Sequence, residues 1–133
     1  MNQRTIKRDR RGTAVTEFAI VAPLLFLFFF AAFEFCRVAM IRHTADSAVY
    51  EGCRTGMIPG ATTGEAEAET RRVLGTLGVT NVNVSVTPSL IDRETDEVTV
   101  RVEVPLDENS FVPNQFVAGR SIVRQLTMQR EGR

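Results

Sequence analysis

The residues of this chain that could do chemistry are few and widely spaced. A single histidine, His43, lies in the segment RHTAD, and the two cysteines, Cys36 and Cys53, are seventeen residues apart. If one helix contains both cysteines, they are about 25 Å apart and beyond disulfide reach, so we expect free thiols, although Cys53 could still pair between chains. The sequence has no metal-ligand cluster, nucleophile elbow or phosphate loop. We therefore expect no catalytic residue, no cofactor, no metal and no enzymatic activity.

Glu17 is an acidic residue at the start of an apolar segment, where a charge is unfavourable. It stands directly before sixteen uncharged residues, 18–33, and seven of the nine phenylalanines lie between residues 18 and 35. A carboxylate at the centre of a bilayer costs about 2.5–3.5 kcal/mol, and less near an edge. Stabilisation by the helix dipole in a first turn is the simpler interpretation of such an acid. The alternative is that Glu17 is functional, as acids inside membranes usually are.

The apolar segment has the length of a membrane span. The uncharged residues 18–33 cover roughly 24 Å as a helix and residues 13–36 roughly 36 Å, which brackets a hydrocarbon core of about 30 Å. A secretory signal peptide is the competing interpretation, but the run ends FFAAFEFCR and offers no good Ala-x-Ala site. We expect a single spanning helix that the mature protein retains.

Charge is segregated along the chain and predicts how the span is oriented. Residues 1–12 hold five basic residues against one aspartate, a net of +4, whereas the whole chain has a net charge of zero. Only Arg37 and Arg42 follow closely beyond the span, so the N-terminus is expected in the cytoplasm and the remainder outside the cytoplasmic membrane. Because the remainder carries a net −4, we expect no nucleic-acid partner.

The sequence RRGTAVTEF, residues 10–18, resembles the class III signal of type IV pilin-like proteins. The resemblance implies that a membrane-bound prepilin peptidase cuts between Gly12 and Thr13, so the chain is a substrate of this enzyme. Glu17 then becomes the fifth residue of the mature chain. In the pilin family this glutamate is thought to meet the N-terminal ammonium of a neighbouring subunit, which assigns Glu17 a role in assembly and register.

The wider pattern resembles the TadE-like proteins of the tight-adherence, or Flp, pilus. It comprises residues 10–26, Glu34 with the continuation TADSAVYEGCRTG, and a short β-rich body that ends in QLTMQRE. The resemblance implies a pseudopilin or minor pilin that helps to assemble the pilus. The implied partners are other pilin or pseudopilin subunits and the Tad assembly machinery, and the implied location is the bacterial cytoplasmic membrane or the pilus itself.

Two groups of residues near the end of the span suggest packing contacts. Glu34 precedes Arg37 by one helical turn, so these two side chains can pair at the outer membrane edge; Glu34 could also bond a neighbouring subunit. Ala48, Gly52 and Gly56 repeat every fourth residue and would form a smooth ridge if the helix continues. The ridge could face the body or a neighbouring subunit, or the helix could simply end near Gly52.

The rest of the chain predicts a small α+β body. Thr62 and Glu65 form a candidate capping box for an amphipathic helix that ends before Gly78. Alternating apolar residues predict strands over 81–87, 97–104 and, less regularly, 121–128. A long loop over 105–120 separates the last two strands, and Phe111 and Phe116 are expected to dock it on the sheet or to bind a partner.

We therefore expect a pilin-like α+β fold in which a long N-terminal transmembrane helix precedes a short helix and a three-stranded antiparallel sheet. The expected organisation is a cleaved basic leader (1–12), the spanning helix with its extension (13–56) and an exported domain (57–133). The alternative is an uncleaved single-pass membrane protein whose extracytoplasmic domain binds a partner or a ligand, with Glu17 merely tolerated at the boundary.

Overall fold

The computed structural model of the protein describes residues 10–92, 94–109 and 119–129. The chain divides into two compact units, Met1–Phe33 and Glu34–Arg133. Most of the basic leader, together with Phe111 and Phe116 of the expected docking loop, lies outside the described residues. The division falls within a helix, so residues 34–56 belong to the same unit as the sheet, whereas the sequence grouped them with the spanning helix.

The first helix, α1, runs from Arg10 to Gly56 and includes Pro23. Proline is tolerated in apolar helices, where local adjustments satisfy the freed backbone carbonyl. The helix continues four residues past Gly52, which was one of the places where the sequence allowed it to end, and reaches Gly56. It stops after Gly56, in a turn that contains Pro59 and Gly60, and Gly60 has a positive φ of 88°. A side chain at that φ would be strained, so glycine suits the turn.

The second helix, α2, spans Thr63–Gly75 and confirms the expected capping box. The Thr62 hydroxyl accepts a hydrogen bond from the Glu65 backbone N–H, and the Glu65 carboxylate accepts one from the Thr62 N–H at 2.8 Å. These bonds satisfy donors that a helix start otherwise leaves free. One turn from the C-terminus of α2, Arg72 pairs with Glu69 and holds the pKa of that carboxyl below its usual value.

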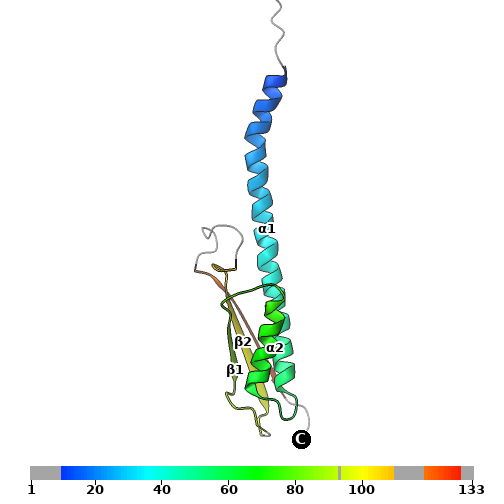
Figure 1. Ribbon diagram of the computed structural model, residues 1–133, viewed down its shortest axis with the longest axis vertical. Coiled ribbons are helices and arrows are strands. Elements are labelled where there is room, and N and C mark those ends of the chain that lie inside the picture. The colour runs from blue at the N-terminus through cyan, green and yellow to red at the C-terminus, as the bar shows by residue number, and fades with distance from the viewer. Residues whose placement is uncertain (1–9, 93, 110–118, 130–133) are drawn as a thin grey trace, which may run out of the picture. The chain divides into compact units, whose positions relative to one another are not determined.

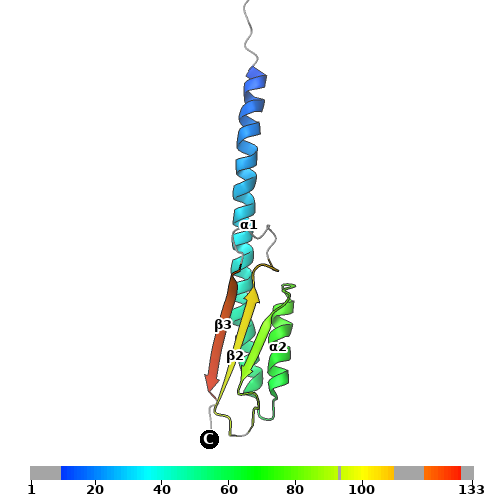
Figure 2. The ribbon, with the colours of Figure 1, turned by 90° about the vertical axis from the view of Figure 1, so that its left-hand side faces the viewer.

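Three strands form one antiparallel sheet in the order β1 (Asn83–Thr87), β2 (Glu97–Pro105) and β3 (Ser121–Gln129), as Figure 2 shows. Strand β1 begins two residues later than the sequence predicted. Asn81 adopts a left-handed conformation with φ of 55°, and the Val82 carbonyl accepts a hydrogen bond from the Arg71 side chain. This backbone leaves the extended region just before the strand, which accounts for the later start.

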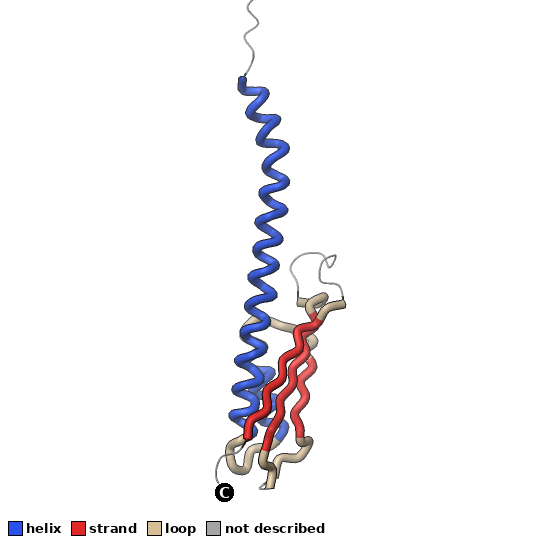
Figure 3. The backbone as a smooth tube through the Cα atoms, turned by 180° about the vertical axis from the view of Figure 1, so that it is seen from behind, coloured by secondary structure: helices blue, strands red, loops and turns tan. Residues whose placement is uncertain are grey.

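The core lies between one face of the sheet and the helices that cover it (Figures 1 and 3). The central strand supplies four fully buried valines, Val98, Val100, Val102 and Val104. Alternate residues of a strand face opposite sides, so the polar Thr99, Arg101 and Glu103 lie on the uncovered face. Burial of an apolar side chain of this size stabilises by about 1.5–3 kcal/mol.

Helix α2 and residues 34–56 of α1 contribute the remaining core. The buried side chains of α1 include Ile41, Ala45, Ala48, Val49 and Cys53, and those of α2 are Ala66, Thr70 and Leu74. Their spacing of three and four residues places each set on one helix face. The architecture is therefore α+β, with a long apolar helix, a short helix and a three-stranded antiparallel sheet, as the sequence predicted.

Candidate functional site

The residues of the expected processing site lie in the first turns of α1. Gly12, Thr13 and Glu17 are helical and exposed. The Thr16 hydroxyl donates a 2.8 Å hydrogen bond to the Gly12 carbonyl oxygen. Among the described residues, no atom outside the local helix lies within 4 Å of a Cβ built on Gly12. The peptide bond between Gly12 and Thr13 is thus sterically open but held in helical conformation.

An apolar surface follows directly after Glu17. Phenylalanines 18, 26, 28, 29, 30, 33 and 35 are each more than half exposed, as are the leucines between them. Single apolar side chains on a surface are ordinary, but a continuous apolar surface of this kind marks contact with lipid or with another protein. In the part of the chain that the structure describes, α1 is the one helix long and apolar enough to cross a membrane. This helix indicates that the protein is anchored in a membrane.

Arg37 reaches from α1 to two distant parts of the second unit. One guanidinium nitrogen donates to the Leu77 carbonyl at 3.2 Å, and another donates to the Asn109 carbonyl at 3.4 Å. Leu77 lies in the turn after α2, where a cation is favoured by the carbonyls at the helix end. Glu34, the partner considered for Arg37 in the sequence, is half-buried one turn earlier. Arg37 therefore connects α1, at the start of the second unit, to the turn after α2 and to the turn after β2.

Asn109 is a buried polar residue that the sequence reasoning did not identify. Its side-chain amide donates to the carbonyls of Thr80 (3.0 Å) and Pro105 (2.7 Å), and its oxygen accepts from the Thr80 N–H at 2.8 Å. Three bonds from one side chain join the end of β2 to the segment before β1. An asparagine in a loop is common in sequences, so no local signal marks this one.

The ridge of small residues on α1 faces the inside of the second unit. Ala48 is fully buried, and a Cβ built on Gly52 would overlap the Thr70 hydroxyl and lie 3.3 Å from the Ala66 carbonyl oxygen. At Gly56 a Cβ would lie 3.1 Å from a methyl group of Val98. The ridge therefore lets α1 pack closely against α2 and the sheet, so these residues do not form an exposed surface.

The two cysteines and the histidine occupy different environments. Cys36 and Cys53 are both free, as expected; Cys36 is exposed and Cys53 is buried. The Cys53 thiol donates to the carbonyls of Leu126 (3.2 Å) and Val98 (3.7 Å). A thiol enclosed in this way is not presented to another chain, which argues against an intermolecular disulfide at Cys53. His43 is exposed on α1.

An ion pair joins the edge of the sheet to α1. The Arg124 guanidinium of β3 lies 2.7 Å from the Asp46 carboxylate. Arg124 shares the covered face of the sheet with Ile122, Leu126 and Met128, since it pairs in register with the buried Val102. The charge at this position explains why the alternation over 121–128 looked irregular in the sequence.

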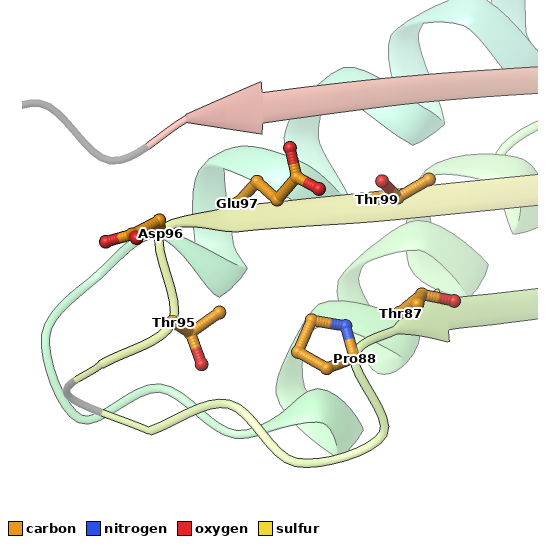
Figure 4. Close-up of a pocket in the computed structure, with 6 residues that line it drawn as sticks. All are labelled: Thr87, Pro88, Thr95, Asp96, Glu97 and Thr99. Atoms are coloured by element: carbon orange, nitrogen blue, oxygen red, sulfur yellow. The ribbon is translucent and has the colours of Figure 1, made fainter.

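A shallow hollow lies where β1 ends and β2 begins (Figure 4). Its lining residues are Thr87, Pro88, Thr95, Asp96, Glu97 and Thr99. The described residues contain no group of three or more histidines, cysteines or acidic residues placed to hold a metal ion. The hollow thus supplies no ligand set for a metal.

Comparison with known proteins bears on the N-terminal part of the chain. The family model of TadE-like protein matches residues 12–54, which include Gly12, Glu17 and nearly all of α1. No significant match was found among curated proteins or among solved structures. The match confirms the resemblance seen in the sequence, for a segment that covers less than half of the chain. Residues 12–54 are thus similar to TadE-like proteins.

Proposed function

We propose that the protein is a minor pilin or pseudopilin that takes part in assembling a tight-adherence pilus. The observation that carries the proposal is the exposed apolar surface of α1, which follows Glu17 within the TadE-like segment. An apolar helix of this length inserts in a bilayer or packs among the helices of other subunits. The function is therefore protein–protein packing, with the small α+β body presented to other pilus components.

Leader removal would prepare the chain for assembly. Cleavage between Gly12 and Thr13 by a prepilin peptidase creates an ammonium at Thr13, about 6 Å along the helix axis from Glu17. In a filament, the Glu17 carboxylate would neutralise the Thr13 ammonium of a neighbouring subunit. An unpaired charge in an apolar interior is strongly unfavourable, so this pair would fix the register between subunits.

The proposed orientation places the N-terminus in the cytoplasm and the second unit outside the cytoplasmic membrane. The basic leader supports this orientation, because positive residues remain on the cytoplasmic side. The proposed partners are the prepilin peptidase, other pilin or pseudopilin subunits and the Tad assembly proteins.

The decisive experiment is N-terminal sequencing and intact-mass measurement of the membrane-bound protein, with and without a co-expressed prepilin peptidase. We expect a chain that begins at Thr13 only when the peptidase is present. The variant Gly12→Val should keep its leader, because a side chain at the residue before the cut blocks a close approach of the backbone. A wild-type chain that keeps residues 1–12 beside an active peptidase would favour an uncleaved single-pass membrane protein instead.

Orientation is tested by labelling with a membrane-impermeant maleimide in intact cells. Tyr50→Cys in a Cys36→Ser background places one accessible thiol on the second unit, because Tyr50 is about half exposed (49%) and Cys53 is fully buried. We expect labelling of this variant in intact cells, and labelling of Thr5→Cys only after lysis when Gly12→Val is also present, because that variant keeps the leader that carries residue 5. The reverse pattern would contradict the proposed topology.

A further inference from the structure

Thr16 contacts the carbonyl of the bond that the proposed peptidase would cut. Its hydroxyl donates to the Gly12 oxygen at 2.8 Å. In an α-helix the N–H of each residue also bonds the carbonyl four residues earlier, which for Gly12 is again the N–H of Thr16. One residue thus supplies both the side-chain and the backbone donor to this oxygen.

Apart from the two hydrogen bonds from Thr16, the surroundings hold the Gly12–Thr13 peptide bond only weakly in the helical conformation. Gly12 and Thr13 are exposed, and glycine is a poor helix former. The Gly12–Thr13 bond lies in the first described turn of α1, which is described from Arg10 onwards. To free the Gly12 carbonyl oxygen, the chain must open this turn of the helix. The two hydrogen bonds that this oxygen accepts from Thr16 must then break.

Peptide hydrolysis needs that carbonyl to be free. Water adds to the Gly12 carbonyl carbon, the bond to the Thr13 nitrogen breaks, and the nitrogen leaves with a proton, which yields a Gly12 carboxylate and a Thr13 ammonium. The oxygen that develops negative charge is stabilised by donors of the peptidase. The Gly12 oxygen accepts hydrogen bonds from both donors of Thr16. It must lose these bonds before it can accept hydrogen bonds from the peptidase.

We infer that Thr16 is a positioning residue of the substrate, whose hydroxyl keeps the Gly12–Thr13 bond in a closed helical turn and so limits the rate of leader removal. The inference rests on the proposed function, because it assumes cleavage at this bond. The open turn is the form that the peptidase binds. The apparent affinity of the peptidase for the chain is then its affinity for the open form multiplied by the fraction of chains that are open.

The test compares steady-state cleavage of the full-length chain in detergent micelles by a purified prepilin peptidase. In Thr16→Val the hydroxyl is lost, while valine has nearly the same helix propensity as threonine. Loss of one hydrogen bond should raise the open fraction about two- to ten-fold. We expect KM to fall by that factor with kcat unchanged, and backbone amide exchange at residue 16 to become faster.

Two control variants separate the proposed role from other effects. Thr16→Ser keeps a hydroxyl at the same place and should behave as the wild type. Ser47→Ala removes a similar bond, from Ser47 Oγ to the His43 carbonyl at 3.1 Å, far along the same helix, and should leave cleavage unchanged.

An unchanged or higher KM for Thr16→Val, or a change confined to kcat, would overturn the inference while the wild type is still cut after Gly12. A wild-type chain that is not cut after Gly12 would instead overturn the proposed function, and the inference with it. N-terminal sequencing of the products tells these two failures apart.

Discussion

At the scale of the residue, Gly52 shows how a missing side chain sets the distance between two helices. The Thr70 hydroxyl lies where the Cβ of any other residue at position 52 would be. Thr70 is fully buried and donates to the Ala66 carbonyl at 2.7 Å, so its hydroxyl has little freedom to move away. Any other residue at position 52 would therefore force the contact between α1 and α2 to shift.

Gly52→Ala is expected to lower the free energy of unfolding by about 1–3 kcal/mol, the usual cost of overpacking a buried site. The measurement is thermal or urea unfolding of the full chain in detergent, followed by circular dichroism. Gly64→Ala serves as the control, since no described atom outside the local helix lies within 4 Å of a Cβ at Gly64. In the double variant with Thr70→Ala, stability should return in part; a purely additive loss would show that the two side chains do not collide.

Asn109 acts as a single-residue connection between two loops. Asn109→Ala leaves the backbone groups of Thr80 and the Pro105 carbonyl without their partner. Unsatisfied polar groups at a partly buried site cost about 1–3 kcal/mol, so we expect a loss of about 2 kcal/mol and faster amide exchange at Thr80. Asn114→Ala, at the other asparagine between β2 and β3, is the comparison variant. Equal exchange at Thr80 in the wild type and Asn109→Ala would contradict this role.

At the scale of the element, β3 is an edge strand whose outer side is not paired with another strand of the sheet. Long edge strands pair readily with other chains, and natural proteins discourage such pairing with charges that point inward. Arg124 is a charge of this kind, held by Asp46 at the border of the core. The partly exposed pair adds little stability on its own, about 0–1 kcal/mol.

Arg124→Val is expected to complete the apolar alternation of β3 and to change stability by less than about 1 kcal/mol, because the pair that it removes is weak. Without the charge the edge should pair more readily, so self-association should appear at lower protein concentration in sedimentation or light scattering. Asp46→Asn keeps the arginine and should not show this increase. Equal association of Arg124→Val and the wild type would mean that Arg124 does not protect the edge.

At the scale of the whole molecule, the chain combines an apolar helical unit with a small α+β unit. The α+β unit buries its own valines and needs no partner to cover the inner face of its sheet. The helical unit exposes its phenylalanines and must find lipid or other helices. The proposed function follows this division, with one unit that inserts or assembles and one that is presented.

Glu17→Gln is expected to leave leader removal intact and to prevent incorporation with other pilin subunits. Removing one partner of a buried ion pair costs about 3–5 kcal/mol, because the Thr13 ammonium of the neighbour would lose its counter-charge. Co-purification of tagged subunits from membranes or sheared pili measures the effect. Glu51→Gln is the matched control, since Glu51 pairs with Arg54 at the surface of the second unit, at 3.6 Å. Normal incorporation of Glu17→Gln would show that Glu17 does not set register.

The sequence by itself determined the elements, because the signals for elements are local. The capping box at Thr62 and Glu65, the alternation of valines over 97–104 and the apolar run after Glu17 each lie within a few residues. The order of α-helices and strands, and the α+β class, follow from such patterns. The TadE-like resemblance is local as well, since the matched segment covers residues 12–54.

Only the tertiary structure decided which distant residues meet. Arg37 and the Asn109 carbonyl are 72 residues apart, and the partners Thr80 and Asn109 are separated by 29 residues. The surroundings of the small residues on α1 were also decided in this way: Gly52 and Gly56 weaken a helix in isolation, but here they allow close packing on Thr70 and Val98. Helix propensity acts along the chain, whereas packing acts between segments, and a single sequence records only the first directly.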